Sequence, residues 1–169
     1  MAIICQYMGM FCPNCGSEQI EVTNSRPTNK GIQIWRRRKC LKCDFLFTTH
    51  EKIDLGHITV VKRSGKRVKY VGAKLYSSIY HVVVGQKKID RGDSGITSKK
   101  IFDEVEEKLI LSQKKVTSTK EIGEIVLKIM MSEAPGAGLR YLAFFKVDGK
   151  KVDVNKITKD LIKYSCKIR

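Results

Sequence analysis

The order of apolar and polar residues predicts a β-hairpin that leads into helices from residue 58 onward. The runs 58–63 and 66–70 are strand-like, and Ser64-Gly65 between them is typical of a hairpin turn. A helix is expected over 73–84, where apolar residues recur at helical spacing before Gly85, a residue that suits a helix C-terminus.

Two more helices are predicted further along the chain. The segment 86–95 holds two glycines and several charges and is expected to be a loop, after which Thr97 or Ser98 can cap a helix. Ser118-Thr-Lys-Glu121 has the form of a capping box. The helix that it opens carries apolar residues at i, i+3, i+4, i+7 and i+8: Ile122, Ile125, Val126, Ile129 and Met130.

The last third of the chain is less regular. Proline and two glycines in 134–138 are expected to break the preceding helix. The segment 140–147 is apolar enough to be buried, as a helix or a strand, and a short helix is expected over 158–164 in a basic tail. The fold class predicted from these elements is α+β.

Composition places the chain among folded proteins, because 42% of its 169 residues are apolar and 30% are charged. The sequence has no apolar run of 18 residues, so no transmembrane helix is expected. The first ten residues lack the basic start and the small-residue cleavage site of a signal peptide. A cytoplasmic, nucleoid-associated protein is expected.

Four of the six cysteines form two C-x-x-C motifs, Cys12 with Cys15 and Cys40 with Cys43, separated by 24 residues. The segment that holds them is too short for a hydrophobic core of its own. Four thiolates suit a tetrahedral Zn²⁺ and leave no open position, so the predicted site is structural and zinc binding is part of folding. A redox C-x-x-C is the alternative, which the second motif disfavours.

The other two cysteines and His50 are not expected to bind the metal. Cys5 and Cys166 lie outside the paired motifs and are taken as free thiols. His50 follows the second pair, but the ligand set is already complete, so it is expected on the surface.

The net charge of +16 favours a polyanionic partner, most often a nucleic acid. A membrane surface is the alternative, although no basic amphipathic helix stands out near either end to support it. Between the two cysteine pairs, no acidic residue occurs from Arg26 to Cys43. The candidate residues for binding DNA lie in this stretch: Arg26, Arg36, Arg37, Arg38, Lys39 and Lys42.

The segment 32–39 is expected to be a strand that enters the second cysteine pair. Alternation would place Arg36 and Arg38 on one face and Arg37 and Lys39 on the other, so neither face is buried. Such a ribbon suits a phosphate backbone or a groove, whereas the alternative is an ordinary solvated surface. Trp35 either stacks on a base or caps a small core, and the core is favoured.

The hairpin after residue 58 is also basic. Cations around its glycine turn could hold phosphates, but neither G-x-x-x-x-G-K-[ST] nor G-x-G-x-x-G occurs, so the residues alone favour a solvated hairpin. His57 and His81 have no partner at a catalytic spacing, and H-E-x-x-H is absent. The sequence therefore predicts no enzyme.

Five motifs of the chain form a recognisable set: Cys12-Pro-Asn-Cys-Gly16, Asn24-Ser-Arg-Pro27, Trp35-Arg-Arg-Arg-Lys-Cys40-Leu-Lys-Cys43, Phe47-Thr-Thr-His-Glu51 and Val60-Val-Lys-Arg-Ser-Gly65. With these motifs the chain closely resembles the NrdR family of bacterial repressors of ribonucleotide reductase genes, from about residue 10 to 148. The resemblance implies a four-cysteine zinc ribbon that binds operator DNA. It also implies a mostly helical ATP-cone, which binds ATP and dATP and controls the oligomeric state.

Matching positions imply a nucleotide-binding set in the cone, with Lys62, Arg63 and Lys74 on phosphates. The full set is Val60, Lys62, Arg63, Lys74, Leu75, Ser78 and Tyr141. The chain departs from the family pattern at four positions: Ser78 replaces glycine, Tyr70 replaces phenylalanine, Ala143 replaces arginine and Asp148 replaces tyrosine.

We therefore expect an extension over 1–10, a zinc ribbon over 11–52, an ATP-cone over 53–148 and a basic tail over 149–169, with Met10 as an alternative start. The expected protein is a homo-oligomeric repressor that binds Zn²⁺, adenine nucleotides and double-stranded DNA. One alternative is a zinc-ribbon RNA- or ribosome-associated protein without a nucleotide response. The other is a regulatory cone cut from a reductase, against which the short length and missing catalytic residues argue.

Overall fold

The computed structural model describes residues 10–84 and 91–146. The chain divides into two compact units between Asp54 and Leu55. The expected extension and basic tail, including the short helix over 158–164, lie outside the described residues, and the expected domain limits stay predictions. None of the helices in the described ranges has the length and apolar content that crossing a bilayer requires.

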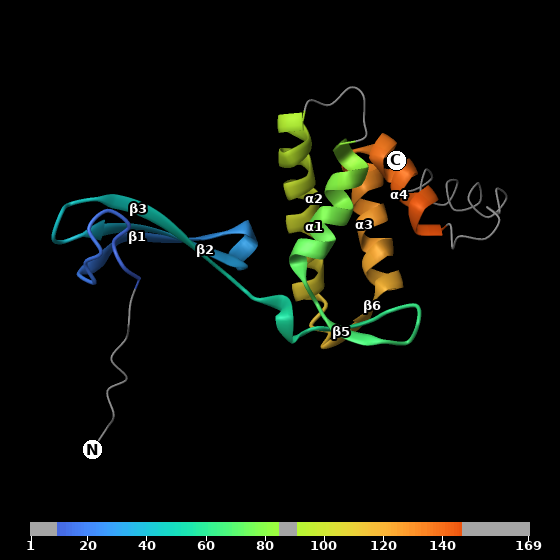
Figure 1. Ribbon diagram of the computed structural model, residues 1–169, viewed down its shortest axis with the longest axis horizontal. Coiled ribbons are helices and arrows are strands. Elements are labelled where there is room, and N and C mark those ends of the chain that lie inside the picture. Colours follow the sequence, from blue (N-terminus) through green and yellow to red (C-terminus); the bar gives the residue numbers. More distant parts are fainter. Residues whose placement is uncertain (1–9, 85–90, 147–169) are drawn as a thin grey trace, which may run out of the picture. The chain divides into compact units, whose positions relative to one another are not determined.

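The first unit is a three-stranded antiparallel sheet in the order β1-β2-β3 (Figure 1). Its strands are β1 (Ile20–Thr28), β2 (Gln33–Cys40) and β3 (Leu46–Lys52). The sequence predicted β2 but missed its two neighbours. Polar residues fill most of β1 and β3 and nearly all of them are exposed, so neither strand shows the apolar alternation that identifies a strand.

Two similar turns hold the cysteine pairs. The Gly16 N–H bonds the Cys12 carbonyl, and the Asp44 N–H bonds the Cys40 carbonyl in the same way. Gly16 and Asp44 both have positive φ, 70° and 56°, as expected from the repeated turn sequence. In the described part of this unit, only Cys12 and Cys40 are buried. The ribbon therefore depends on its cysteines and not on a hydrophobic core.

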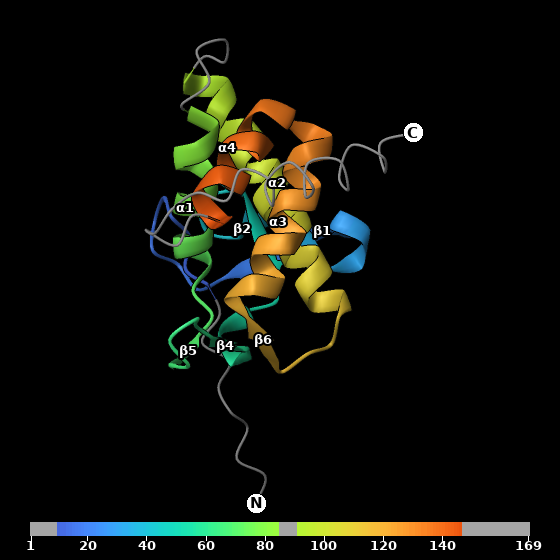
Figure 2. The same ribbon diagram turned by 90° about the vertical axis from the view of Figure 1, so that its right-hand side faces the viewer.

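The second unit packs four helices with a small sheet at one end (Figure 1 and Figure 2). The helices are α1 (Gly72–Val84), α2 (Arg91–Leu111), α3 (Thr119–Glu133) and α4 (Pro135–Lys146). Their apolar faces meet in one core that includes residues with no exposed surface: Ile79, Val83, Ile101, Val105, Val126, Leu127 and Met130. This burial is the main source of the unit's stability.

The small sheet has the order β5-β4-β6. The predicted hairpin is present as β4 (Thr59–Val61) and β5 (Arg67–Lys69), with Gly65 in its turn at φ 81°. The strand β6 (Val116–Ser118) pairs in parallel with β4 and was not predicted. It is too short for a periodic signal, and its partner lies more than fifty residues away in the sequence.

The start of α2 differs from the prediction. Residues 91–95 were expected to be loop but are helical, so Thr97 and Ser98 lie inside the helix and do not cap it. Ser98 is fully buried and donates its hydroxyl hydrogen to the Ser94 carbonyl at 2.6 Å, the bond by which serine is accommodated within a helix. The rest of the expected loop, 86–90, lies outside the described residues.

The start of α3 agrees with the prediction. Ser118 accepts from the Glu121 N–H, and the Glu121 carboxylate accepts from the Ser118 N–H, so the capping box is complete. The expected break over 134–138 shortens to Ala134 alone, because Pro135 begins α4 at the one helical position where its missing N–H costs nothing. The segment left open between helix and strand, 140–147, is helical as far as Lys146.

Candidate metal centre, cationic ribbon and pocket

The four paired cysteines lie at one end of the ribbon, with all their Sγ atoms within 4.8 Å of one another. The Sγ atoms of Cys12 and Cys43 are 3.7 Å apart, and those of Cys15 and Cys40 are 3.6 Å apart. A tetrahedral zinc site with bonds of about 2.3 Å has sulfur–sulfur edges of roughly 3.8 Å. The donor set and its spacing therefore suit a tetrahedral Zn²⁺.

The surroundings of Cys43 favour the thiolate, which is the form that binds metal. The side-chain amide of Asn14 donates to Cys43 Sγ at 3.6 Å, and it lowers the pKa of this thiol to about 6 together with the Phe45 N–H. Asn14 lies within the first C-x-x-C motif, so one cysteine turn stabilises the charge of the other.

The strand register places the ribbon's cations on two faces. The Arg36 face holds Arg36 and Arg38, and the Arg37 face holds Arg37 and Lys39, in agreement with the predicted alternation. Each face continues onto the neighbouring strands through directly paired residues. The Arg36 face thereby gains Ser25 and Thr49 opposite Arg36, and Glu51 opposite Ile34. The Arg37 face also includes Trp35 of β2, and it gains Arg26 and His50 opposite Trp35, Thr48 opposite Arg37, and Glu21 opposite Lys39.

Glu51 engages the two arginines of the Arg36 face. It forms an ion pair with Arg36 at 2.7 Å and lies 3.9 Å from Arg38, whose Nε also donates to Thr49 at 2.9 Å. On the opposite face, Arg37 donates to the uncharged Thr48 hydroxyl at 3.3 Å. Arg36 is therefore partly neutralised by Glu51, and Lys39 on the opposite face by Asp44, whereas the central Arg37 has no acidic partner among the described residues.

Trp35 does not cap a core as favoured from the sequence. The Arg26 guanidinium lies 4.5 Å from the centre of the Trp35 ring and covers it, as expected for a cation–π pair. The described ribbon has no hydrophobic core that the indole could close. Lys39 pairs with Asp44 at 2.8 Å, while Lys42 and His50 are exposed, His50 as expected.

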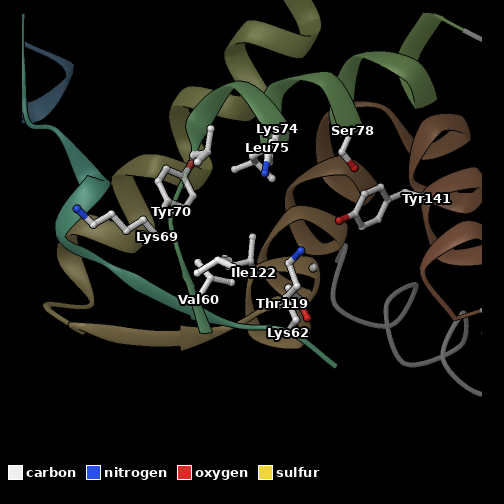
Figure 3. Close-up of a pocket in the computed structure, with 13 residues that line it drawn as sticks. Val60, Lys62, Lys69, Tyr70, Lys74, Leu75, Ser78, Thr119, Ile122 and Tyr141 are labelled. Carbon is white, nitrogen blue, oxygen red and sulfur yellow. The ribbon is translucent and has the colours of Figure 1, made fainter. Parts of the chain in front are cut away.

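A pocket of about 290 Å³ lies in the second unit between the hairpin and three helices (Figure 3). Strands β4 and β5 form one wall, the first turns of α1 and α3 form two others, and α4 contributes Tyr141. Of the residues expected to bind a nucleotide, the structure brings six together in this lining: Val60, Lys62, Lys74, Leu75, Ser78 and Tyr141.

Arg63, the seventh expected residue, is absent from the lining, although its charge acts on Tyr141. Burial raises the pKa of Tyr141 to about 12. The hydrogen bond with Ser78 and the charge of Arg63 act in the other direction and lower this pKa. The expected nucleotide-binding set did not include part of the wall: Val68, Lys69, Tyr70, Val71, Thr119, Ile122 and Gly123. Proximity to the hairpin could have indicated the first four, but only the fold brings α3 to the site.

The pocket is strongly cationic. Lys62, Lys69 and Lys74 line it, and none of them has an acidic partner among the residues that the structure describes. Figure 3 shows Lys62 and Lys74 directing their ammonium groups into the pocket, whereas Lys69 points away from it. The arrangement fits an anionic ligand, and the helix N-termini at α1 and α3 add partial positive charge.

Two family models match the chain in sequence. The model of the transcriptional repressor NrdR-like N-terminal domain covers residues 10–51, and the ATP cone domain covers residues 58–144. These matches confirm the predicted order of a four-cysteine zinc ribbon and an ATP-cone, and with it structural zinc and a regulatory nucleotide as the cofactor and ligand.

Curated relatives cover most of the chain. A protein named transcriptional repressor NrdR from Caldicellulosiruptor bescii is 36% identical over 91% of this chain and 95% of its own length. One of the same name from Bordetella petrii is 35% identical over 81% of this chain and 84% of its own. The names describe repressors and not enzymes, as predicted. With this identity along the chain and both domain models in order, the chain belongs to the NrdR family.

Proposed function

We propose that this protein is a nucleotide-responsive repressor that binds operator DNA of ribonucleotide reductase genes and takes ATP or dATP into its cone. The observation that carries the proposal is a pair of sites on one chain, a cationic ribbon fixed by four cysteines and a lysine-lined pocket. Cys12, Cys15, Cys40 and Cys43 hold a structural Zn²⁺ in this proposal. The zinc fixes the end of β2 from which the cations extend.

Six residues supply the DNA-binding charge, in two groups with different roles. Arg37 makes the closest contacts to DNA, because Glu51 engages Arg36 and Arg38 and Asp44 engages Lys39. Arg37 is available for bidentate contact with phosphate or guanine. The whole proposed set is Arg26, Arg36, Arg37, Arg38, Lys39 and Lys42. Each phosphate that this set neutralises steepens the plot of log binding constant against log salt concentration by roughly 0.9.

The pocket binds the nucleotide with its phosphates between Lys62 and Lys74, whose charges lack acidic partners in the described part of the chain. Val60 and Leu75 contact the apolar part of the ligand, and Ser78 and Tyr141 close the opposite side. Arg63 acts on the site through its charge rather than as part of the wall.

Nucleotide binding controls repression by changing how copies of the chain associate. An assembly that presents several ribbons to paired DNA sites gains affinity through effective concentration. ATP or dATP shifts this equilibrium only as far as its affinity differs between the assemblies. As an operator-binding repressor, the protein would act in the cytoplasm, at the nucleoid.

The test measures molar mass by size-exclusion chromatography with light scattering in ATP, in dATP and in neither, followed by DNA binding of each species. Different assemblies with different operator affinities are expected. One mass and one affinity under all three conditions would contradict the proposal. Equal or tighter binding to structured RNA would favour the RNA-binding alternative.

A further inference from the structure

Trp35 lies in the middle of the Arg37 face. It belongs to the central strand β2, where its register partners are Arg26 on β1 and His50 on β3. Trp35 is half-buried, whereas Arg26 and His50 on either side of it are exposed. Because the described ribbon has no hydrophobic core for the ring to close, the ring can contact only the residues beside it and whatever binds this face.

Arg26 contacts Trp35 without using its hydrogen-bond donors. The guanidinium carbon of Arg26 lies 4.5 Å from the centre of the ring. The ring attracts the charge through its π-electrons, whereas the five N–H donors lie in the plane of the guanidinium. Arg26 has no acidic partner among the residues that the structure describes. Its donors therefore stay available to an acceptor outside the protein.

Two cations of β2 are positioned by carboxylates instead. Arg36 bonds Glu51 at 2.7 Å, and Lys39 bonds Asp44 at 2.8 Å. Each carboxylate restricts the side chain, but it also takes up donors and neutralises charge that an external phosphate would otherwise meet. The aromatic ring restricts Arg26 and leaves both its donors and its charge unused.

Restricting an arginine before it binds favours the binding of an anion. A long exposed side chain loses conformational entropy when an interface orders it. A guanidinium that already lies over a ring has lost part of this freedom, so less is lost on binding. Its planar fork then matches the paired acceptors of a phosphate or of a guanine edge.

We infer that Trp35 is a positioning residue for DNA binding, which holds the Arg26 guanidinium ready for a phosphate or a guanine. The inference rests on the proposed operator binding by the ribbon, and it adds an aromatic residue to a site otherwise proposed from cations. Trp35 acts through Arg26 and not by stacking on a base, because a base on the same face of the ring would have to displace the guanidinium.

The experiment measures binding of the full-length, zinc-loaded protein to a labelled duplex from a ribonucleotide reductase promoter by fluorescence anisotropy. Trp35→Phe keeps an aromatic face, and Trp35→Leu keeps apolar bulk without one. Trp35→Phe is expected to bind within about twofold of the unmodified protein, and Trp35→Leu about fivefold more weakly, as for loss of an exposed cation–π contact. Equal affinities for the two variants would assign Trp35 a packing role and overturn the inference.

A double-mutant cycle separates positioning from direct contact. Arg26→Ala is expected to weaken DNA binding about tenfold, and Trp35→Leu added to it should cause no further loss, because the ring acts through Arg26. If Trp35→Leu keeps its effect in the Arg26→Ala protein, the ring contacts DNA by itself and the inference is wrong. Elemental analysis of zinc verifies that each ribbon is intact. Failure of the unmodified protein to bind the duplex would instead overturn the proposed function.

Emission from Trp35 tests the contact without changing the ring, because this is the only tryptophan in the chain. Arg26→Ala is expected to shift the emission maximum to longer wavelength, since water replaces the guanidinium over the ring. Lys42→Ala is the matched control, because it removes another exposed cation of the ribbon and no described contact of Trp35, and it should leave the maximum unchanged. An unchanged maximum in Arg26→Ala, or strong quenching by saturating DNA from a base stacked on the ring, would overturn the inference.

Discussion

Tyr70 donates a hydrogen bond from its hydroxyl to Glu106, 3.2 Å away, and so joins the residue after β5 to α2. Tyr70 is buried, with 7% of its surface exposed. Burial, assisted by the Glu106 charge, raises the pKa of Tyr70 well above its ordinary range. The hydroxyl therefore remains a donor at neutral and mildly alkaline pH, and it fixes the position of a ring that forms part of the pocket wall.

Replacing Tyr70 with phenylalanine is expected to destabilise the second unit by about 1 kcal/mol, because Glu106 loses a donor in a partly buried site. Urea unfolding followed by helical circular dichroism measures the change. Tyr80→Phe is the matched control, since Tyr80 also lies in this unit and its ring stacks on Tyr76 without a hydroxyl hydrogen bond among the described contacts. Equal midpoints for the two variants would show that the Tyr70–Glu106 bond contributes no stability.

Short-range sequence patterns correctly predicted the features that depend on neighbouring residues. The capping box at Ser118, the hairpin turn at Gly65 and the paired cysteine turns each depend on residues within a few positions of one another. The alternation along β2 likewise follows from strand geometry alone. These predictions needed no knowledge of the tertiary fold.

What the sequence missed depends on distant partners. Strand β6 exists because β4 offers it a parallel edge, and β1 and β3 exist because β2 pairs with both. Thr119 and Ile122 reach the pocket only because α3 packs beside the hairpin. Glu51 partly neutralises Arg36, which no spacing rule in the sequence indicates. Each feature that the sequence did not predict therefore depends on a long-range contact and has only a weak local sequence pattern.

Loss of one zinc ligand is expected to unfold the ribbon while sparing the helices. Cys40→Ser removes a fully buried thiol from the cluster, and the described ribbon has no hydrophobic core to compensate. Elemental analysis should show loss of most bound zinc, and DNA binding should fall with it. Helical circular dichroism should be retained, because all four described α-helices lie after Asp54.

The matched control for this substitution is Cys166→Ser, which changes a cysteine outside the paired motifs. It should keep the zinc content and DNA affinity of the unmodified protein. Full zinc occupancy in Cys40→Ser would contradict the four-cysteine site.

Replacing Arg37 with alanine is expected to weaken operator binding about tenfold and to reduce the salt slope by roughly one, the effect of losing one phosphate contact. Zinc content should not change, because Arg37 bonds Thr48 and no cysteine. Fluorescence anisotropy over a range of salt concentrations measures both quantities. Arg36→Ala is the comparison, and its loss should be smaller because Glu51 already engages Arg36. A larger loss for Arg36→Ala would assign DNA binding to the Arg36 face.

Glu121 makes the second unit sensitive to acid. Its carboxylate accepts from Lys114 at 3.0 Å, from the Thr117 hydroxyl at 2.8 Å and from the Ser118 N–H at 3.0 Å. The Lys114 hydrogen bond, followed by the other two, lowers the pKa of Glu121 to about 2. A carboxyl with a lowered folded-state pKa stabilises the fold fully above its ordinary pKa, and this stabilisation is lost as the pH falls toward the folded-state value.

The urea midpoint of the helical signal should therefore fall between about pH 4.5 and pH 2, and Glu121→Gln should flatten this part of the profile. The amide keeps an acceptor for Lys114 and Thr117 but cannot lose a charge in this range. Glu124→Gln is the control, because Glu124 is exposed on the same helix and has no interaction partner among the described residues. If Glu124→Gln flattens the profile as much as Glu121→Gln, the acid sensitivity reflects overall charge and not the capping network at the start of α3.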